Sequence, residues 1–369
     1  MIQTVSLSDI CTKITSGGTP LTKRDDYYGG GIPWLRTQEV NFGNIYSTEK
    51  TITELGLKNS SAKIIPEDSV IVAMYGATAG RSAINKIPLA TNQACCNLII
   101  DKNKADYRFV YYYLVNSYEK LLSAAVGAAQ QNLGSKQISA MTINLPPLYQ
   151  QKKIADILSS LDEKIELNRR MNETLEQLGQ TLFRHYFVDK AKQSNGNIQT
   201  IPLGKKFHPK RGRSLQARDM ICGDTPVISG GLKPAGFHNE ANTTAPVITI
   251  SASGANAGFV SVWGEPVWSA DSSYIDSTIT KYVYTYYLFL KNKQKEIYDM
   301  QTGSGQPHIY PKHIGLLEIA DLSECEFNDF EQRVRPLFDM IHENKKQIDY
   351  LSNIRDLLLP KLISGGIEI

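Results

Sequence analysis

One long segment, residues 150–188, constrains this chain more than any other part of its sequence. It contains no proline, and no glycine before Gly179. Its apolar residues recur at alternating spacings of three and four, the 3.5-residue period that keeps a and d positions on one side of a coiled-coil helix. The a positions are Ile154, Leu161, Asn168, Leu175 and Leu182, and the d positions are Ile157, Lys164, Met171 and Leu178. A helix of about 57 Å with such a one-sided stripe needs a partner helix.

The partner lies in the same chain, at residues 330–363. This segment repeats the stripe with residue numbers that are higher by 180, so that Leu351 matches Met171. In an antiparallel pair the two stripes dock so that Asn168 falls opposite Asn344, and two facing amides can bond each other and fix the register. Pro336 should kink the second helix or mark its true start, and Pro360 raises the same question near the far end.

The globular parts of the chain repeat as well. The loop Gly76–Gly80 matches Gly254–Gly258, an offset of 178 in the numbering, and the loop 127–133 matches 303–309, an offset of 176. Strand candidates and helical segments stand in the same order around these loops in both copies. The chain is therefore predicted to be a mixed α/β (α+β) protein with an internal pseudo-twofold repeat. Its predicted parts are a first globular domain (1–145), a first long helix (146–189), a second globular domain (190–323) and a second long helix (324–369), with the two helices antiparallel.

Composition limits the compartment and the partners. The formal net charge of +3 permits a nucleic-acid partner without requiring one. The five cysteines include no C-x-x-C pair, and an odd number argues against a disulfide framework. The longest nearly apolar run, residues 121–129, is too short to cross a bilayer. A cytoplasmic protein with no membrane partner is expected.

Motifs for catalysis are missing from the sequence. Gly134-Ser135-Lys136 has the wrong order for a phosphate-binding loop, and the histidines form no zinc-protease motif and no Cys/His cluster. The sequence therefore favours a binding protein that is not an enzyme, with no cofactor and no metal in this chain.

Two kinds of side chain are candidates for binding DNA. The repeated loops carry amide and imidazole groups of the kind that read base edges in a major groove, although Gly, Asn and Pro also form turns for purely local reasons. These residues are Gln130, Gln131, Asn132, Gln306 and His308, with Asn256 in the second glycine loop. Basic residues suit phosphate binding, and a solvated loop is the alternative reading. The basic and aromatic candidates are Lys23, Arg24, Trp34, Arg36, Arg81, Lys136, Lys210, Arg211, Arg213, Lys233 and Lys312. The runs Tyr111–Tyr113 and Tyr284–Phe289 lie on predicted helices, where core packing is favoured over base stacking.

The chain resembles the specificity (S) subunits of Type I restriction–modification systems along its full length. The resemblance rests on IPWLRTQEV (32–40), GATAG (76–80), LPPLYQQKKIADILSSLDEKIELN (145–168) and LLLPKLISG (357–365). It implies two target-recognition domains, each reading half of a bipartite site on double-stranded DNA. It also implies that the paired helices space the domains and carry two modification (methyltransferase) subunits, which bring S-adenosylmethionine. Restriction subunits that use ATP and Mg²⁺ join in systems that cleave DNA.

A second reading of the same architecture is a two-headed adaptor that binds proteins or glycans at the ends of a coiled-coil spacer. The salt dependence of duplex binding separates the two, because a phosphate-contacting protein loses affinity steeply as salt rises.

Overall fold

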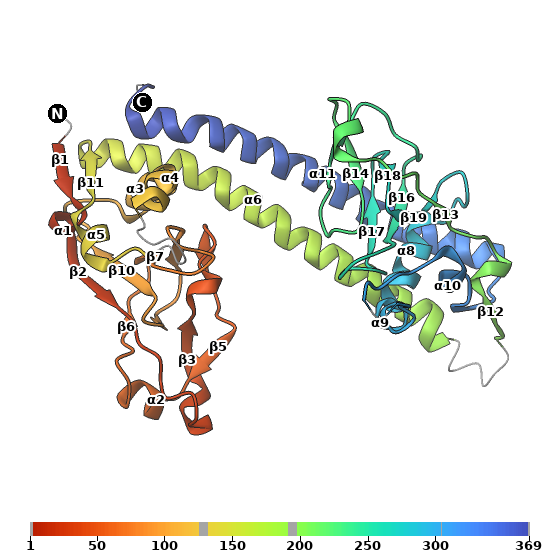
Figure 1. Cartoon of the computed structure of the whole chain (residues 1–369), viewed down its shortest axis with the longest axis horizontal. Helices are drawn as coiled ribbons and strands as arrows, with labels where there is room; N and C mark the ends of the chain where they lie inside the picture. Colours follow the sequence, from red (N-terminus) through yellow and green to blue (C-terminus); the bar gives the residue numbers. More distant parts are fainter. Residues whose placement is uncertain (1–2, 125–131, 191–197, 304, 368–369) are drawn as a thin grey trace. The chain divides into compact units, whose positions relative to one another are not determined.

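The computed structural model describes residues 3–124, 132–190, 198–303 and 305–367, and these divide into two compact units. Unit 1 comprises Met1–Glu166 with Asp349–Ile369, and unit 2 comprises Leu167–Ile348. Each unit therefore contains one globular domain and a part of each long helix, α6 (Leu148–Phe183) and α11 (Glu324–Ser364) (Figure 1). A π-helical segment, Arg184–Asp189, extends α6.

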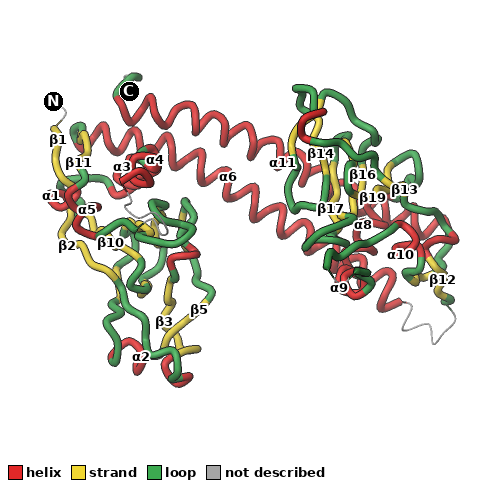
Figure 2. The backbone as a smooth tube through the Cα atoms, viewed as in Figure 1, coloured by secondary structure: helices red, strands yellow, loops and turns green. Residues whose placement is uncertain are grey.

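Unit 1 is built on two mixed sheets (Figure 2). One has the strand order β2-β10-β7-β8-β4, the other has the order β5-β3-β9-β6, and β1 pairs with β11. Apolar residues between the sheets form one core, and a second core joins the first sheet to the helices. The strands are β1 Gln3–Ser6, β2 Cys11–Ser16, β3 Tyr28–Leu35, β4 Asn44–Ile45, β5 Lys50–Ile52, β6 Ile64–Ile65, β7 Val70–Ala73, β8 Ser82–Asn85, β9 Leu89–Thr91, β10 Cys95–Ile100 and β11 Thr142–Leu145. The helices are α1 Leu7–Ile10, α2 Glu54–Lys58, α3 Tyr107–Asn116, α4 Tyr118–Ala124 and α5 Ser135–Ala140.

Unit 2 repeats this plan with fewer strands. Its main sheet has the order β13-β19-β16-β17, a smaller sheet has the order β15-β14-β18, and β12 pairs with β20. The central strand β16 is buried along its whole length, as is β7 at the equivalent place in unit 1. The strands are β12 Thr200–Pro202, β13 Lys210–Arg211, β14 Thr225–Ile228, β15 Gly236–His238, β16 Val247–Ser251, β17 Val260–Trp263, β18 Trp268–Ser269, β19 Ser272–Asp276 and β20 Glu318–Ala320. The helices are α8 Val283–Asn292, α9 Gln294–Asp299 and α10 Pro311–Gly315.

The tyrosine-rich helices belong to the core, as the sequence favoured. Tyr111 and Tyr112 on α3 are buried, and so are Tyr284, Tyr286 and Tyr287 on α8. Each predicted helix breaks into two near its middle, so that α4 follows α3 and α9 follows α8.

The long helices pair antiparallel within each unit, but the predicted register is wrong. In unit 2, Asn168 Nδ2 donates to Gln347 Oε1 (3.2 Å) and Asn344 Nδ2 donates to Asn172 Oδ1 (2.9 Å). Asn168 and Asn344 are both buried, as expected for residues between paired helices. They do not bond each other, because Asn168 bonds Gln347 and Asn344 bonds Asn172.

The error comes from the assumed period. Buried positions on α6 follow the roughly 3.6-residue turn of a straight helix, so the buried face moves away from strict heptad positions. Leu158 and Ile165 are buried, whereas Leu178 is 44% exposed and the predicted d residue Lys164 is exposed. The offset that relates the two helices is accordingly 176 in the numbering, as in the second pair of loops, and not 180.

The second long helix begins at Glu324, and Pro336 does not mark its start. Ser323 and Glu326 form its N-terminal capping box, so α11 starts well before Pro336, which is exposed, and continues past Pro360. Glu331 lies inside the helix, 4% exposed, and its carboxylate accepts hydrogen bonds from the backbone and side chain of Thr285 at the start of α8.

Candidate nucleic-acid interface

Each unit presents a pair of loops at the end of its central strand. In unit 1, the Ala79 amide donates to the Gly76 carbonyl (3.1 Å) and the Gly80 amide donates to the Ala73 carbonyl (2.9 Å), which closes a tight turn after β7. The second loop joins this turn because the Leu133 amide donates to the Met74 carbonyl (2.7 Å) and Tyr75 bridges to Asn132.

Unit 2 forms the same hydrogen bonds with equivalent residues. The Ala257 amide donates to Gly254 (3.0 Å), and the Gly258 amide donates to Ser251 (2.8 Å). The Ile309 amide donates to Ala252 (2.9 Å), and Ser253 bridges to His308. The predicted equivalence of the loops is therefore confirmed, down to individual backbone bonds, for the residues that the structure describes, and residues 127–131 lie outside them.

Glycine is required at the last position of both turns. Gly80 and Gly258 have φ values of +79° and +88°, in the left-handed region that side chains disfavour. A Cβ at Gly258 would also lie 2.8 Å from Ile297 of α9, and one at Gly80 would lie 3.4 Å from the Tyr118 ring of α4. The turns are thereby held against the helices behind them, while Gly76, Ala77 and Ala255 remain exposed.

A basic and aromatic cluster surrounds the loop pair of unit 2. The Tyr310 ring, 40% exposed, has the Arg211 guanidinium carbon and the Lys312 Nζ each 5.9 Å from its centroid, and the His308 ring stacks on it at 6.0 Å. Asp271 accepts from Arg211 Nη2 (2.8 Å) and from the Ser253 hydroxyl, so it orients the guanidinium beside the loop. Cations next to an exposed ring suit both phosphate contact and base-edge contact.

The loop pair of unit 1 carries different side chains on the same backbone. Tyr75 is 38% exposed and Asn132 is exposed. Arg81, which follows Gly80, donates to the Asn41 amide oxygen, and its guanidinium carbon lies 5.9 Å from the centroid of the Phe42 ring. Phe42 is 36% exposed and has a φ of +60°, an unusual conformation for a bulky residue. Two loop pairs of one shape thus present two different chemical surfaces.

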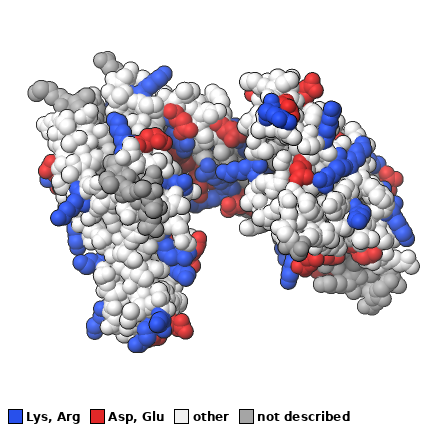
Figure 3. Space-filling view, in the orientation of Figure 1, with Lys and Arg blue, Asp and Glu red and all other residues white. Residues whose placement is uncertain are grey.

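Several basic candidates of unit 2 are exposed and available. Among the residues that the structure describes, no ion pair involves Lys210, Arg213, Lys233 or Lys312. Lys210 lies on β13 beside Arg211, and the Arg213 guanidinium carbon lies 5.9 Å from the centroid of the Trp268 ring. On the face drawn in Figure 3, Lys and Arg are scattered over each unit with Asp and Glu among them. Local clusters, and not one large basic face, therefore offer the cationic contacts there.

Three candidates of unit 1 bond other residues of the protein. Trp34 is 4% exposed and its indole N–H donates to the Gly18 carbonyl (3.0 Å), so it is a core residue and its ring cannot contact DNA. Arg36 pairs with Glu39 and Glu49, and Arg24 pairs with Asp26 at 2.7 Å. Lys23 is exposed.

The remaining candidates divide by their placement. Lys136 and Gln306 are exposed, whereas Asn256 and His308 are partly buried in the loop pair of unit 2 or against it. Gln130 and Gln131 lie outside the described residues, so the predictions for them stay predictions.

Four residues of these clusters were not among the sequence candidates: Tyr310, Asp271, Phe42 and Tyr75. Tyr310 had a weak signal, since it stands between the candidates His308 and Lys312. Asp271 had none, because its partners Arg211 and Ser253 are distant in the sequence and reach it only through the pairing of β19 with β13 and with β16.

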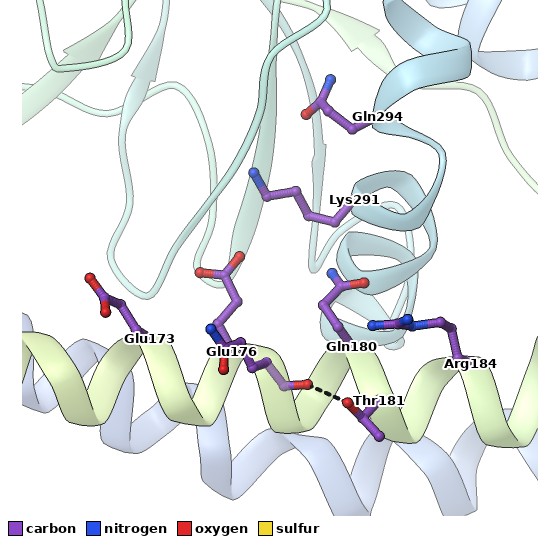
Figure 4. Close-up of a pocket in the computed structure, with 8 residues that line it drawn as sticks. Glu173, Glu176, Gln180, Thr181, Arg184, Lys291 and Gln294 are labelled. Carbon is purple, nitrogen blue, oxygen red and sulfur yellow. Dashed lines mark hydrogen bonds between the residues drawn. The ribbon is translucent and has the colours of Figure 1, made fainter. Parts of the chain in front are cut away.

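A polar hollow of about 650 Å³ lies in unit 2 between α6 and the α8–α9 segment (Figure 4). Lys291 and Gln294 line it opposite Glu176 of α6 and Arg184 of its π-helical extension. Burial lowers the pKa of Lys291, and the nearby Glu176 opposes that shift. The lining mixes both charges with amides, so it favours no single class of small ligand.

Chemistry beyond binding finds little support in the described part of the chain. No group of three or more His, Cys, Asp or Glu side chains there could hold a metal ion. Burial raises the pKa of Cys11, Cys95 and Cys96 to about 12, which keeps these thiols protonated and unreactive. None of the described helices is both long enough and apolar enough to cross a membrane.

Comparison with known proteins finds similarity to one family. The family model described as the Type I restriction modification DNA specificity domain matches residues 2–177. A Type I restriction enzyme specificity subunit from Methanocaldococcus jannaschii is 27% identical over 399 residues, which cover 97% of this chain and 91% of that protein. A putative type I specificity subunit from Mycoplasma genitalium is 25% identical over a stretch that covers 85% of this chain and 86% of that protein.

The fold is shared with a solved protein of the same kind. The crystal structure of a Type I restriction–modification S subunit from M. genitalium aligns over 98% of this chain and 96% of its own, with a TM-score of 0.69 at 21% identity. The chain is therefore similar to the specificity subunits of Type I restriction–modification systems, and the model of their DNA specificity domain matches its residues 2–177.

Proposed function

We propose that this chain is the non-catalytic DNA-reading subunit of a Type I restriction–modification complex. Its two loop pairs contact the two halves of a bipartite site on double-stranded DNA. The observation that carries this function is the loop pair itself, built twice with the same backbone hydrogen bonds but with different side chains. One shape with two surfaces suits a protein that reads two different half-sites.

The reaction chemistry belongs to partner subunits in this proposal. Two modification subunits supply S-adenosylmethionine and methylate the DNA, and a restriction subunit, where present, supplies ATP-dependent cleavage with Mg²⁺. The chain itself needs no cofactor and works in the cytoplasm, where its DNA is. Named relatives that are specificity subunits of Type I restriction enzymes support this assignment.

The side chains divide into two roles. Lys210, Arg213 and Lys312 contact phosphates, which fixes position without sequence preference. His308 and Arg211 in unit 2, and Asn132 in unit 1, reach base edges.

Methylome sequencing tests the function directly. Deleting the gene from the source genome should remove methylation at one bipartite motif, and restoring the gene should return it. Complementation with Asn132→Ala should relax one half of that motif, and Arg211→Ala should relax the other. Lys346→Ala, which removes an exposed cation of α11, is the control and should leave the motif intact. An unchanged set of motifs after deletion would contradict the proposed function.

Salt provides a second test in solution. Binding of the assembled complex to its duplex should weaken as salt rises, and Lys210→Glu or Arg213→Glu should weaken it on all sequences. Binding that is insensitive to salt would instead favour the adaptor reading.

A further inference from the structure

The interface between α6 and α11 is here called the seam, and the residues that face one another at one level along it form a layer. The internal repeat lets each layer in unit 1 be compared with its counterpart in unit 2. Residues of α6 and α11 whose numbers differ by 176 share the same burial, as Leu158 with Val334 and Ile165 with Ile341 show. Asn168 and Asn344 are also counterparts, and each bonds an amide of the other helix. Most layers thus have the same character in both units.

One layer breaks this equivalence. In unit 1, the Asp162 carboxylate accepts from Arg355 Nη1 (2.7 Å) on α11 and from the Tyr112 hydroxyl (2.8 Å) on α3. The Asp162 and Arg355 side chains are only 20% and 28% exposed. Arg355 also donates to the neighbouring Asp356. The layer is therefore a largely buried ion pair whose carboxylate also accepts a hydrogen bond from a tyrosine hydroxyl.

The counterparts of these residues in unit 2 are all apolar or small. By the same offset in the numbering, Phe338 replaces Asp162, Gly179 replaces Arg355 and Leu288 replaces Tyr112. They also meet, since a Cβ at Gly179 would lie 3.3 Å from Leu288 Cδ2 and 3.8 Å from Phe338 Cε2. In unit 2 the Phe338 ring therefore packs towards Gly179, and this layer contains no charged group.

These two layers decide which helix α6 can accept. If a second α6 took the place of α11, repeat symmetry would put Gly179 of the second chain opposite Asp162. The carboxylate would then be largely buried with no cation, an arrangement that strongly destabilises a protein. The other layers would tolerate the exchange, since Asn168 would face Asn172 and Ile165 would face Leu175.

The selection acts on one helix only. Two α11 helices would place Arg355 opposite Phe338, and a guanidinium that keeps its bond to Asp356 is tolerated beside an aromatic ring. We propose that the layer of Asp162, Arg355 and Tyr112 makes α6 selective for an α11 segment, from this chain or from another chain with arginine at that position, and excludes a second α6.

The test starts from the folded full chain, with a protease site placed between residues 190 and 200 and cut after purification. Isotope-labelled and unlabelled cut proteins are mixed and warmed until native mass spectrometry shows that fragments have exchanged fully between the labelled and unlabelled complexes. Complexes of two N-terminal fragments are then counted. The cut wild-type protein should form almost none, and the cut Asp162→Asn protein should form them readily.

The expected difference is large because a pair of α6 helices places Asp162 opposite Gly179 twice, once from each chain. Each layer disfavours the pair by about tenfold after allowance for solvent screening, hence about 100-fold in all. Asp156→Asn is the matched control, since Asp156 lies on the same helix but is 65% exposed and bonds Arg108 outside the seam. It should behave as the wild type.

Two outcomes would overturn the proposal. Pairs of N-terminal fragments that are as abundant in the wild type as in Asp162→Asn would show that the layer does not select. Pairs that are absent from both proteins after full exchange would show that something other than Asp162 excludes them. Neither outcome bears on DNA reading, which the methylome experiment tests separately.

Discussion

Replacing Glu331 with alanine should release α8 from the long helix behind it. The Glu331 carboxylate accepts from the Thr285 amide (2.9 Å), the Thr285 hydroxyl (2.8 Å) and Arg335 Nη2 (2.9 Å), and the Tyr284 amide approaches it at 3.5 Å. Thr285 lies in the first turn of α8, where backbone amides have no partner within the helix. The side chain from α11 therefore serves as the N-terminal cap of α8.

The magnitude follows from what alanine leaves behind. Glu331→Ala removes the acceptor of a buried amide and a buried hydroxyl, which should cost about 3 kcal/mol. For a domain of the size of unit 2 that loss lowers the melting temperature by roughly 6–12 °C. Glu331→Gln keeps one acceptor oxygen and removes the buried charge. Because burial raises the pKa of Glu331, so that keeping it ionised is itself unfavourable, glutamine should cost no more than about 1 kcal/mol.

Two measurements check this reasoning. Calorimetry gives the melting temperature, and hydrogen exchange should show faster exchange of the Thr285 amide in Glu331→Ala than in the wild type. Gln332→Ala, an exposed change on the same turn of α11, is the control. Glu331 would not be the cap of α8 if Glu331→Ala destabilised no more than Gln332→Ala, or if Glu331→Gln were as damaging as Glu331→Ala.

Three further predictions concern stability. Arg355→Gln should cost about 2 kcal/mol in urea unfolding by leaving Asp162 without its cation, and adding Asp162→Asn should recover at least half of that loss. Burial lowers the pKa of His342 to about 4, so the fold disfavours its charged form. The contribution of neutral His342 to the free energy of unfolding should be fully present above about pH 6.5 and should fall by about 2 kcal/mol towards pH 4. His342→Leu should flatten that part of the pH profile. Gly254→Ala, where only φ is unfavourable, should cost about 1 kcal/mol, and Gly258→Ala should cost about 1–2 kcal/mol more because its Cβ meets α9; equal losses would contradict this.

Local patterns predicted much of the fold. The two long helices, their antiparallel pairing, the repeated glycine turns and the buried tyrosine helices all follow from spacing and composition. The helix register did not follow, because a heptad fitted to the whole of α6 assigns Lys164 to the seam, whereas the structure buries Ile165. A small difference between periods of 3.5 and 3.6 accumulates along a helix of this length.

The site was harder to predict than the fold, since its residues meet through tertiary structure. Trp34 is a candidate from the sequence, yet its indole N–H donates to the Gly18 carbonyl in the core. Asp271 gave no signal, although it orients Arg211 and Ser253. No sequence pattern contains such pairings, because strand register decides which side chains become neighbours.

The loop pairs are held together almost entirely by main-chain groups, and this has a consequence for how such proteins change. Amide-to-carbonyl bonds do not depend on side-chain identity, so the exposed positions can vary while the turn keeps its shape. A new preference in one half of the molecule can then arise by point substitution, without repair elsewhere and without disturbing the other half. Diversity at these positions among relatives would be the mark left by such change.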